Sequence, residues 1–191
     1  MKFVHIADVH LDIPFTTLEG RNLSEKRRLE QREAIKNVIE YVKENNIPYL
    51  FICGDLYENE YVRESSVDYI NKLFETILDT KIYIIPGNHD PYIKNSYYAS
   101  YNWSKNVKIF KEKIEKVEED NICIYGYGFE DFYMKKNEYE KIEIKDKNKI
   151  NILLTHGTLD GSTSDEMLYN PISKTTLKEI GFDYVGLRTY S

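Results

Sequence analysis

Apolar residues gather in short runs that alternate with stretches of helical periodicity. The runs typical of buried strands are Phe3–Ala7, Ile47–Cys53, Lys81–Ile85 and Ile150–Thr155. Between the first three runs, apolar residues recur at helical intervals, which predicts a helix from Ser24 to about Asn45 and another over about Val62–Leu78. The order strand, helix, strand, helix, strand favours parallel pairing of the strands.

Each predicted helix has one apolar face. The face of the first helix is formed by Leu29, Ala34, Ile35, Val38, Ile39 and Val42. That of the second is formed by Val67, Ile70, Leu73, Phe74 and Ile77. Ser24 is expected to cap the first helix, because its hydroxyl can accept a hydrogen bond from a free N–H of the first turn.

The middle of the chain has a different pattern. The short, alternating segments there are Val107–Phe110, Lys113–Val117 and Ile122–Tyr127, which predict an antiparallel region. Glu138–Asp146 is rich in Lys and Glu and is expected to be a surface excursion. Ser173–Ile180 is expected to be a short helix and Asp183–Leu187 a last strand. Mixed sheets covered by helices indicate the α/β class, in a layered sandwich.

The composition is that of one globular domain. The chain has 191 residues, of which 41% are hydrophobic and 30% charged. Its net charge of −6 argues against a large, sequence-independent nucleic-acid footprint, which needs many Lys and Arg residues. DNA stays compatible as a substrate, because bound metals add local positive charge that this sum omits.

Cysteine use and hydropathy predict a cytoplasmic protein without a membrane partner. Cys53 and Cys123 lie far apart in apolar stretches, which is typical of buried thiols in a reducing compartment. Asp8 comes too early for a signal peptide, and no apolar run approaches the roughly 20 residues needed to cross a membrane.

Polar motifs follow the predicted strands in a fixed order. They are Asp8-Val9-His10, Gly54-Asp55, Gly87-Asn88-His89-Asp90 and His156-Gly157. Each motif alone has an ordinary interpretation as a turn, a cap or a satisfied polar group. Three of the four histidines of the chain fall in these motifs, and the fourth, His5, alternates with apolar residues as an ordinary strand residue. Together the motifs indicate a constellation that holds divalent metals.

The residue types point to two-metal hydrolysis of a phosphate ester. Asp8 and His10 are two residues apart on an extended segment, so both can reach one ion. Asp55 can bridge two ions, and Asn88 offers a neutral oxygen ligand. Donors of nitrogen and oxygen without thiolate suit Mn, Fe, Zn, Ni or Mg. Two ions about 3.5–4 Å apart would share Asp55 and a hydroxide that attacks phosphorus.

The second half of the Gly87–Asp90 motif brings proton chemistry. His89 offers a proton donor beside the Asn88 ligand, and Asp90 is expected to orient its imidazole. We therefore expect His89 and Asp90 to be catalytic, with His89 stabilising or protonating the leaving group.

At these motifs the chain resembles the calcineurin-like metallophosphoesterases, and within them the bacterial DNA repair exonucleases of the SbcD and YhaO type. The matching segments are His5–Phe15, Gly54–Tyr57, Gly87–Asp90 and Gly181–Val185, spread over essentially the whole chain. The resemblance implies a four-layer α-β-β-α fold with two mixed sheets. It also implies Mn-dependent cleavage of DNA phosphodiesters, often with an ATPase partner of the SbcC kind.

The resemblance further implies a role for each motif residue. The implied metal ligands are Asp8 and His10 for one ion, Asp55 for both ions, and Asn88 and His156 for the other. His89 would be the catalytic residue.

The end of the chain departs from this family. The family's last strand is followed by Gly-His-x-His, which completes both metal shells, whereas this chain has Arg188-Thr189-Tyr190-Ser191. We therefore expect one domain over residues 1–191, truncated before that motif, impaired or inactive as it stands, and without a capping or partner-binding region. One inserted nucleotide would explain the tail, because the shifted frame reads Gly-His-Ile and begins a His codon. Truncation with vector residues and a natural variant tail are the alternatives.

Other functions stay open at this point. A small-molecule phosphoesterase acting on a nucleotide or sugar-nucleotide would suit the pI of about 5.4. A metal-poor binding or scaffold module would follow if evolution had removed the last ligands. A homodimer is also left open.

The basic stretch of the chain consists of Arg21, Lys26, Arg27, Arg28 and Arg32. We expect it to be a solvated helix face, with phosphate contact as the alternative.

Overall fold

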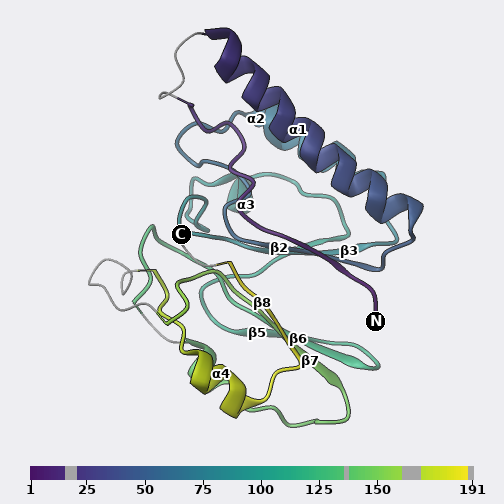
Figure 1. Ribbon diagram of the computed structural model, residues 1–191, viewed down its shortest axis with the longest axis vertical. Coiled ribbons are helices and arrows are strands. Elements are labelled where there is room, and N and C mark those ends of the chain that lie inside the picture. Colours follow the sequence, from purple (N-terminus) through teal and green to yellow (C-terminus); the bar gives the residue numbers. More distant parts are fainter. Residues whose placement is uncertain (16–20, 136–137, 161–168, 189–191) are drawn as a thin grey trace.

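The computed structural model of the chain describes residues 1–15, 21–135, 138–160 and 169–188, with two four-stranded sheets at its centre (Figure 1). The first sheet consists, in spatial order, of β1 (Val4–Ile6), β2 (Tyr49–Cys53), β3 (Lys81–Ile85) and β4 (Val107–Ile109). All its strands are parallel, and Leu50 of β2 lies between Val4 and Ile82. Helices connect β1 to β2 and β2 to β3, as parallel pairing requires.

The second sheet is mixed. It consists of β5 (Glu115–Glu118), β6 (Ile122–Gly126), β7 (Ile150–Leu154) and β8 (Tyr184–Gly186). Only β5 and β6 pair in antiparallel fashion. The antiparallel prediction was therefore wrong for Val107–Phe110, because β4 pairs in parallel with β3. A long connection through α3 (Tyr97–Ser100) separates β3 from β4 and lets the chain return in the same direction.

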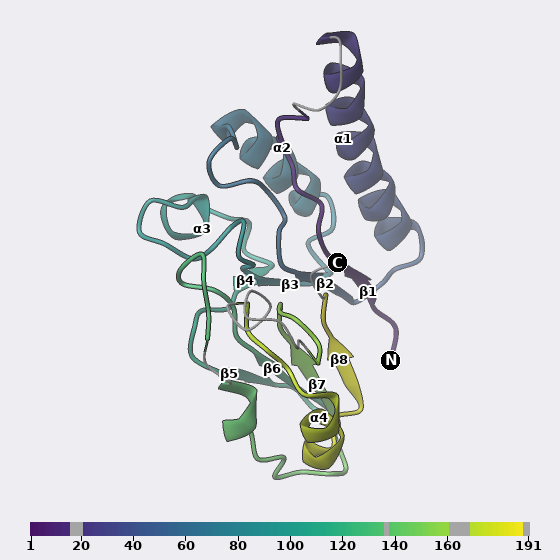
Figure 2. The same ribbon diagram turned by 60° about the vertical axis from the view of Figure 1, so that its left-hand side comes forward.

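Helices cover the outer face of each sheet, so the molecule has the four layers α-β-β-α that the resemblance implied (Figure 2). The covering helices are α1 (Arg21–Glu44) and α2 (Glu64–Glu75) on the first sheet, and the 3₁₀ helix η1 (Glu138–Lys141) and α4 (Lys174–Ile180) on the second. Side chains alternate along each strand, so Leu50 and Ile52 face the helices while Phe51 and Cys53 face the other sheet. The central strands β2, β3, β6 and β7 are consequently buried on both faces along most of their length.

The first helix differs from its prediction at its start. α1 begins at Arg21, so Ser24 lies inside it and its hydroxyl donates to the carbonyl of Phe15 (3.3 Å) rather than capping the helix. The buried residues of α1 include Ile35, Ile39 and Val42, as predicted. Leu29 and Ala34 are exposed instead. Leu29 lies toward the start of α1, whose first turns extend beyond the layers beneath them (Figure 1), whereas Ala34 precedes the buried Ile35 and lies on the exposed side of the helix.

Other elements differ in extent or burial. α2 is shorter than the predicted Val62–Leu78. The segment Glu138–Asp146, predicted as a surface excursion, buries Tyr139 and Ile142 in the core beneath α4. These apolar residues are three apart on a turn of helix, so they anchor a segment whose other residues are polar. The helix predicted over Ser173–Ile180 is confirmed.

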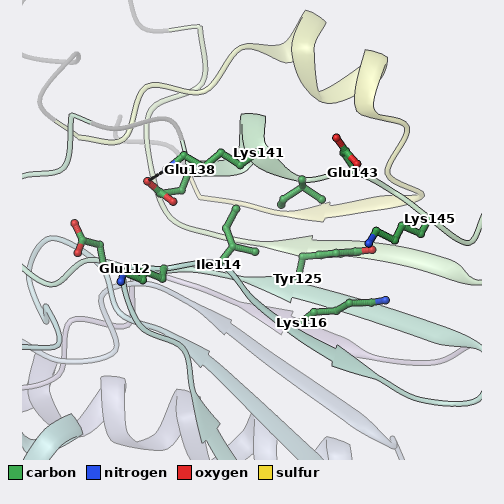
Figure 3. A pocket seen from close by; sticks show the side chains of 10 residues that line it. Glu112, Ile114, Lys116, Tyr125, Glu138, Lys141, Glu143 and Lys145 are labelled. Carbon is green, nitrogen blue, oxygen red and sulfur yellow. Dashed lines mark hydrogen bonds and ion pairs between the residues drawn. The ribbon is translucent and has the colours of Figure 1, made fainter.

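A cavity of about 600 Å³ lies between β5, β6 and the segment that begins with η1 (Figure 3). Its charged lining contains both signs and consists of Glu112, Lys113, Lys116, Glu138, Lys141, Glu143 and Lys145. Lys141 forms an ion pair with Glu138, and Lys116 with Glu118. The charges of this cavity therefore largely cancel.

Each helix in the described ranges is too short or too polar to cross a membrane.

Candidate metal centre

The motif residues lie in loops that follow β1, β2, β3 and β7, where the two sheets meet. Backbone hydrogen bonds from Asp8 to Gly54 (3.1 Å) and from His10 to Asp55 (2.9 Å) continue the pairing of β1 and β2 beyond the strands. These bonds hold the first two motifs side by side. His156 reaches the same place from the second sheet.

Glycine is required where the motifs approach one another most closely. A Cβ atom at Gly54 would overlap the imidazole of His156, and one at Gly87 would overlap the carboxylate of Asp55. Gly54 also has a φ of +87°, which side chains with a Cβ atom disfavour. Both glycines therefore allow functional side chains to pack directly on the backbone.

The deepest part of the site is a group of facing donor atoms. Oδ2 of Asp55 lies 3.3 Å from Nε2 of His156, and Oδ1 of Asn88 lies 3.1 Å from the same nitrogen. Nδ1 of His156 is 3.1 Å from the carbonyl oxygen of Cys53. Because that oxygen can only accept, we assign the proton of the neutral imidazole to Nδ1. The lone pair of Nε2 then points at two oxygen atoms.

Such an arrangement needs a cation. Oδ1 of Asp8, a member of the same group, is buried without a hydrogen-bond partner. Burial disfavours a charged imidazole, yet Asp55 raises the pKa of His156 by hydrogen bonding and charge. The site therefore attracts a positive charge, as a proton or as a metal ion. Carboxylate, amide and imidazole donors together suit a divalent metal of the Mn, Zn or Fe type.

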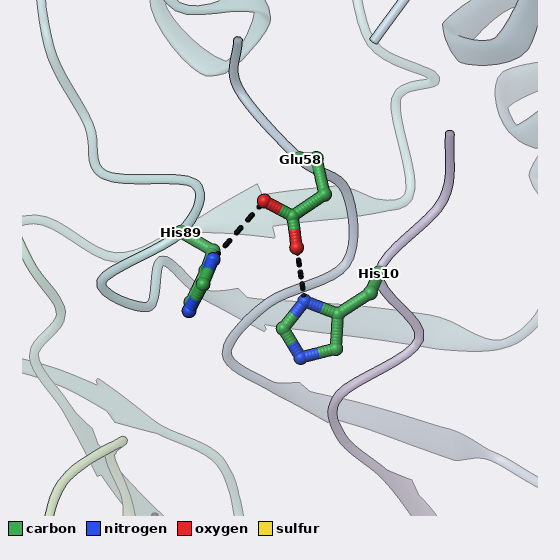
Figure 4. Close-up of side chains that lie close together, drawn as sticks. All are labelled: His10, Glu58 and His89. Carbon is green, nitrogen blue, oxygen red and sulfur yellow. Dashed lines mark hydrogen bonds and ion pairs between the residues drawn. The ribbon is translucent and has the colours of Figure 1, made fainter. Parts of the chain in front are cut away.

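A second group lies beside the first and contains a residue that the motifs did not reveal. Glu58 accepts from His10 Nδ1 through Oε1 (2.6 Å) and from His89 Nδ1 through Oε2 (3.0 Å) (Figure 4). Nε2 of His10 lies 3.8 Å from Oδ2 of Asp55, which connects the two groups. One carboxylate thus sets the orientation of both imidazoles.

Glu58 also controls the charge of these imidazoles. Burial opposes its ionisation, but the hydrogen bonds from His10 and His89 prevail and lower the pKa of Glu58 to about 2. The hydrogen bond to Glu58 raises the pKa of His89 to about 9. His89 therefore carries a proton at neutral pH, and it is positioned at the mouth of the site with its side chain 38% exposed.

Asp90 has a different role from the one expected. Its Oδ1 accepts from the backbone N–H groups of Asp55 (3.0 Å) and Gly87 (2.6 Å), and its Oδ2 accepts from Leu56 N–H (2.6 Å) and Tyr98 Oη (2.7 Å). This corrects the expectation that Asp90 orients His89, since that contact is made by Glu58. The fully buried Asp90 instead fastens the loop after β2 to the loop after β3.

Arg188, the last residue that the structure describes, reaches the same site. Its Nε forms an ion pair with Oδ2 of Asp8, and its carbonyl oxygen accepts from Gly157 N–H (3.2 Å). The guanidinium therefore places a positive charge against one of the expected ligands. Thr189, Tyr190 and Ser191, the rest of the unusual tail, lie outside the described residues.

The structure therefore brings all the expected ligands to one place. These are Asp8, His10, Asp55, Asn88 and His156, with His89 beside them. The grouping differs in detail, because Asp8 clusters with Asp55 and His156 while His10 clusters with Glu58 and His89. Sequence reasoning missed Glu58 because it lies outside the four motifs, and only its position three residues after Asp55 could have favoured it.

Comparison with known proteins agrees with this geometry. A sequence profile described as calcineurin-like phosphoesterase matches residues 1–186. The chain belongs to this family. Calcineurin-like phosphoesterases use divalent metals, and the clusters described above supply the donor groups. The resemblance inferred from the motifs and the sandwich fold is thereby confirmed.

Two named relatives are similar to this chain over nearly its whole length. The chain is 25% identical over 197 residues to the uncharacterized metallophosphoesterase YhaO of Bacillus subtilis (strain 168), covering 98% of this chain and 48% of the relative. It is 28% identical over 221 residues to the SbcD subunit of the nuclease SbcCD of Staphylococcus epidermidis (strain ATCC 12228 / FDA PCI 1200), covering 98% and 56%. The chain thus spans about half the length of these relatives.

Proposed function

We propose that the chain hydrolyses phosphodiester bonds of DNA with two divalent metal ions, preferably Mn²⁺, as the nuclease domain of a repair exonuclease. The observation that supports this most is the convergence of Asp8, His10, Asp55, Asn88 and His156 at the junction of the two sheets. The relative whose name includes "nuclease" supports a nucleic acid as the substrate, and the resemblance of the motifs to DNA repair exonucleases favours DNA.

The side chains divide the work in this proposal. Asp55 lies between the donors of both groups, so it is the residue able to serve two ions. When bound, the ions would stabilise charge on the phosphoryl oxygens and supply a nucleophile from water. His89, fixed by Glu58 through Nδ1, turns its other ring nitrogen away from that carboxylate and gives a proton to the leaving oxygen (Figure 4).

The assembly belongs to the same proposal. The name of the staphylococcal relative, a subunit of SbcCD, supports an ATPase partner of the SbcC kind for the whole protein, and a second copy of the chain is compatible with it. Two buried free cysteines support a reducing compartment such as the cytoplasm.

The substrate is tested by comparing DNA with small phosphate esters. With enzyme in excess and millimolar Mn²⁺, we expect slow cleavage of an end-labelled single-stranded oligonucleotide that EDTA abolishes. Excess enzyme is needed because the guanidinium of Arg188 lies against Asp8, one of the expected ligands, so turnover by this chain is expected to be low. Cleavage of nucleotides or aryl phosphodiesters without cleavage of DNA would favour a small-molecule phosphoesterase. Inertness toward every substrate, both of this chain and of a variant with Gly-His-Ile-His at residues 188–191, would favour a binding or scaffold module.

The tail itself leads to a separate prediction. Arg188 lies against Asp8, and no imidazole from the tail can complete either metal shell. Replacing Arg188–Ser191 by Gly-His-Ile-His should therefore tighten Mn²⁺ binding by at least about 10–100-fold, the cost of losing even outer-shell partners. Isothermal titration calorimetry measures the change.

A matched control separates the effect of the Arg188 guanidinium from the effect of the added histidines. Arg188→Gly removes the guanidinium without adding histidines, so it should recover only part of the gain. Equal Mn²⁺ affinity in the natural chain and in both variants would contradict this account of the tail.

A further inference from the structure

A second cavity lies next to the metal centre and outside it. It has a volume of about 410 Å³ and is enclosed by α1, the loop after β1 and the segment that leads into α2. Its walls continue directly into the loops of the metal centre. Asp12, in one wall, is two residues beyond His10, and that length of chain spans at most about 7 Å. In the other wall, Tyr61 N–H donates to the carbonyl of Glu58 (3.0 Å).

The cavity collects arginines. Arg28, Arg32 and Arg63 all line it, opposed by the carboxylates of Asp12 and Glu25. Asp12 is engaged internally, because its Oδ2 accepts from Ser66 Oγ (2.6 Å) and from the backbone N–H of Arg63 (3.1 Å). Its Oδ2 is thus directed at the start of α2.

The arginines differ in what they contact. Arg32 donates to Ser66 Oγ (2.9 Å), lies 3.9 Å from Asp12 and packs over the ring of Tyr69, so it is part of the wall. Among the described residues, Arg28 and Arg63 form no ion pair, and Nε of Arg28 is buried without a hydrogen-bond partner. The cavity therefore contains guanidinium donors that its own acids do not satisfy.

The structure also divides the basic stretch of α1. Lys26 and Arg27 pair with Glu30 on the exposed face, which is the solvated face expected from the sequence. Arg28 and Arg32 turn into the cavity instead. The side chain of Arg21 lies outside the described residues.

The rim suits a nucleotide strand. Leu29 and Tyr61 line the cavity and are 66% and 49% exposed. Bases of single-stranded nucleic acid stack on such aromatic rings, while planar guanidinium groups bind phosphate through paired hydrogen bonds. The cavity combines arginines with an exposed ring, and its walls include Asp12 and Tyr61, which are close in sequence to His10 and Glu58. This combination matches a phosphate and a base next to the bond being cut.

We propose that this arginine cavity binds a phosphate of single-stranded DNA that flanks the scissile one. The proposal rests on the proposed nuclease function, and it explains how a chain with a net charge of −6 holds a polyanion: a short, local contact replaces a broad basic surface.

Binding without turnover tests this directly. Fluorescence anisotropy would follow a labelled 12-nucleotide strand on the whole chain across a salt series without added metal. The variant Arg28→Gln/Arg63→Gln should bind at least about tenfold more weakly, the usual effect of removing charged hydrogen bonds. The slope of log affinity against log salt should flatten by about 0.7 for each phosphate that the variant no longer neutralises. Arg32 is left intact because it supports the wall.

The controls separate the cavity from general charge and from folding. Lys145→Gln removes one positive charge at the β5–β6 cavity of Figure 3 and should leave the affinity unchanged. Arg28→Lys/Arg63→Lys should keep most of the binding, and thermal melting should show that every variant is folded.

The outcomes also distinguish this proposal from the nuclease function. The cavity proposal would be overturned if Arg28→Gln/Arg63→Gln and the unaltered chain bound the oligonucleotide with equal affinity and equal salt slope. It would also be overturned if Lys145→Gln weakened binding as much as Arg28→Gln/Arg63→Gln, or if the unaltered chain bound no oligonucleotide. Binding of an acidic peptide by the chain, without binding of the oligonucleotide, would also overturn the cavity proposal. Oligonucleotide binding that needs the arginines, without Mn²⁺-dependent cleavage even in the variant with Gly-His-Ile-His at residues 188–191, would support the cavity and contradict the nuclease function instead.

Discussion

Replacing Asp55 with alanine is expected to remove both metal ions and all phosphoesterase activity together. Oδ2 of Asp55 faces Nε2 of His156 at 3.3 Å and Nε2 of His10 at 3.8 Å, so a single oxygen serves the donors of both groups. When two metal ions share one ligand, loss of that ligand weakens the binding of both ions. Mn²⁺ titration by calorimetry should show no saturable binding in the variant at concentrations that load the natural chain.

The control for this experiment has to separate charge from loop structure. Oδ1 of Asp55 also accepts from His89 N–H (3.0 Å), so alanine loosens that loop as well. Asp55→Asn keeps an acceptor at this position and removes only the charge, and it should still lose both ions. Asp79→Ala, at an exposed acid after α2, should bind Mn²⁺ normally. Retention of one tightly bound ion by Asp55→Asn would contradict a shared ligand.

In a form of the protein with the family's final histidines restored, His89→Ala is expected to keep the metal ions and to lower the rate by about 10²–10⁴-fold, the usual scale for losing a positioned proton donor. Glu58 fixes the imidazole and keeps it protonated at neutral pH, since the hydrogen bond raises the pKa of His89 to about 9. Single-turnover cleavage of an oligonucleotide measures the rate, and calorimetry measures Mn²⁺ affinity.

A second histidine provides the comparison. His5 lies outside the motifs, and its Nδ1 is 2.9 Å from the hydroxyl of Tyr184. His5→Ala should therefore leave the rate of the folded protein unchanged. A full rate in His89→Ala would show that the proton reaches the leaving group by another path.

The positions of the motifs could be predicted from the sequence because strand ends are local features. Asp8, Asp55 and Asn88 each follow a buried apolar run, and parallel strands place such ends at one edge of a sheet. His156 was harder, because it follows β7 of the other sheet. Nothing local reveals that two sheets will pack with these ends together, and only the resemblance supplied that information.

Side-chain partners inside the loops could not be predicted in the same way. Asp90 is adjacent to His89, yet its carboxylate turns back onto backbone N–H groups because the tight turns leave them without strand partners. Glu58 is far from His89 in sequence and contacts it in space. Likewise, the periodicity of Leu29 predicts an inward residue, but it cannot show where the surface under α1 ends.

The most direct test of the two-metal site is anomalous diffraction from crystals soaked in millimolar Mn²⁺. We expect two peaks about 3.5–4 Å apart at the junction of the sheets, with the Asp55 carboxylate between them. One peak should lie near Asp8 and His10 and the other near Asn88 and His156. A single peak without contact to Asp55, or Mn²⁺ bound only elsewhere, would contradict a two-metal phosphodiesterase.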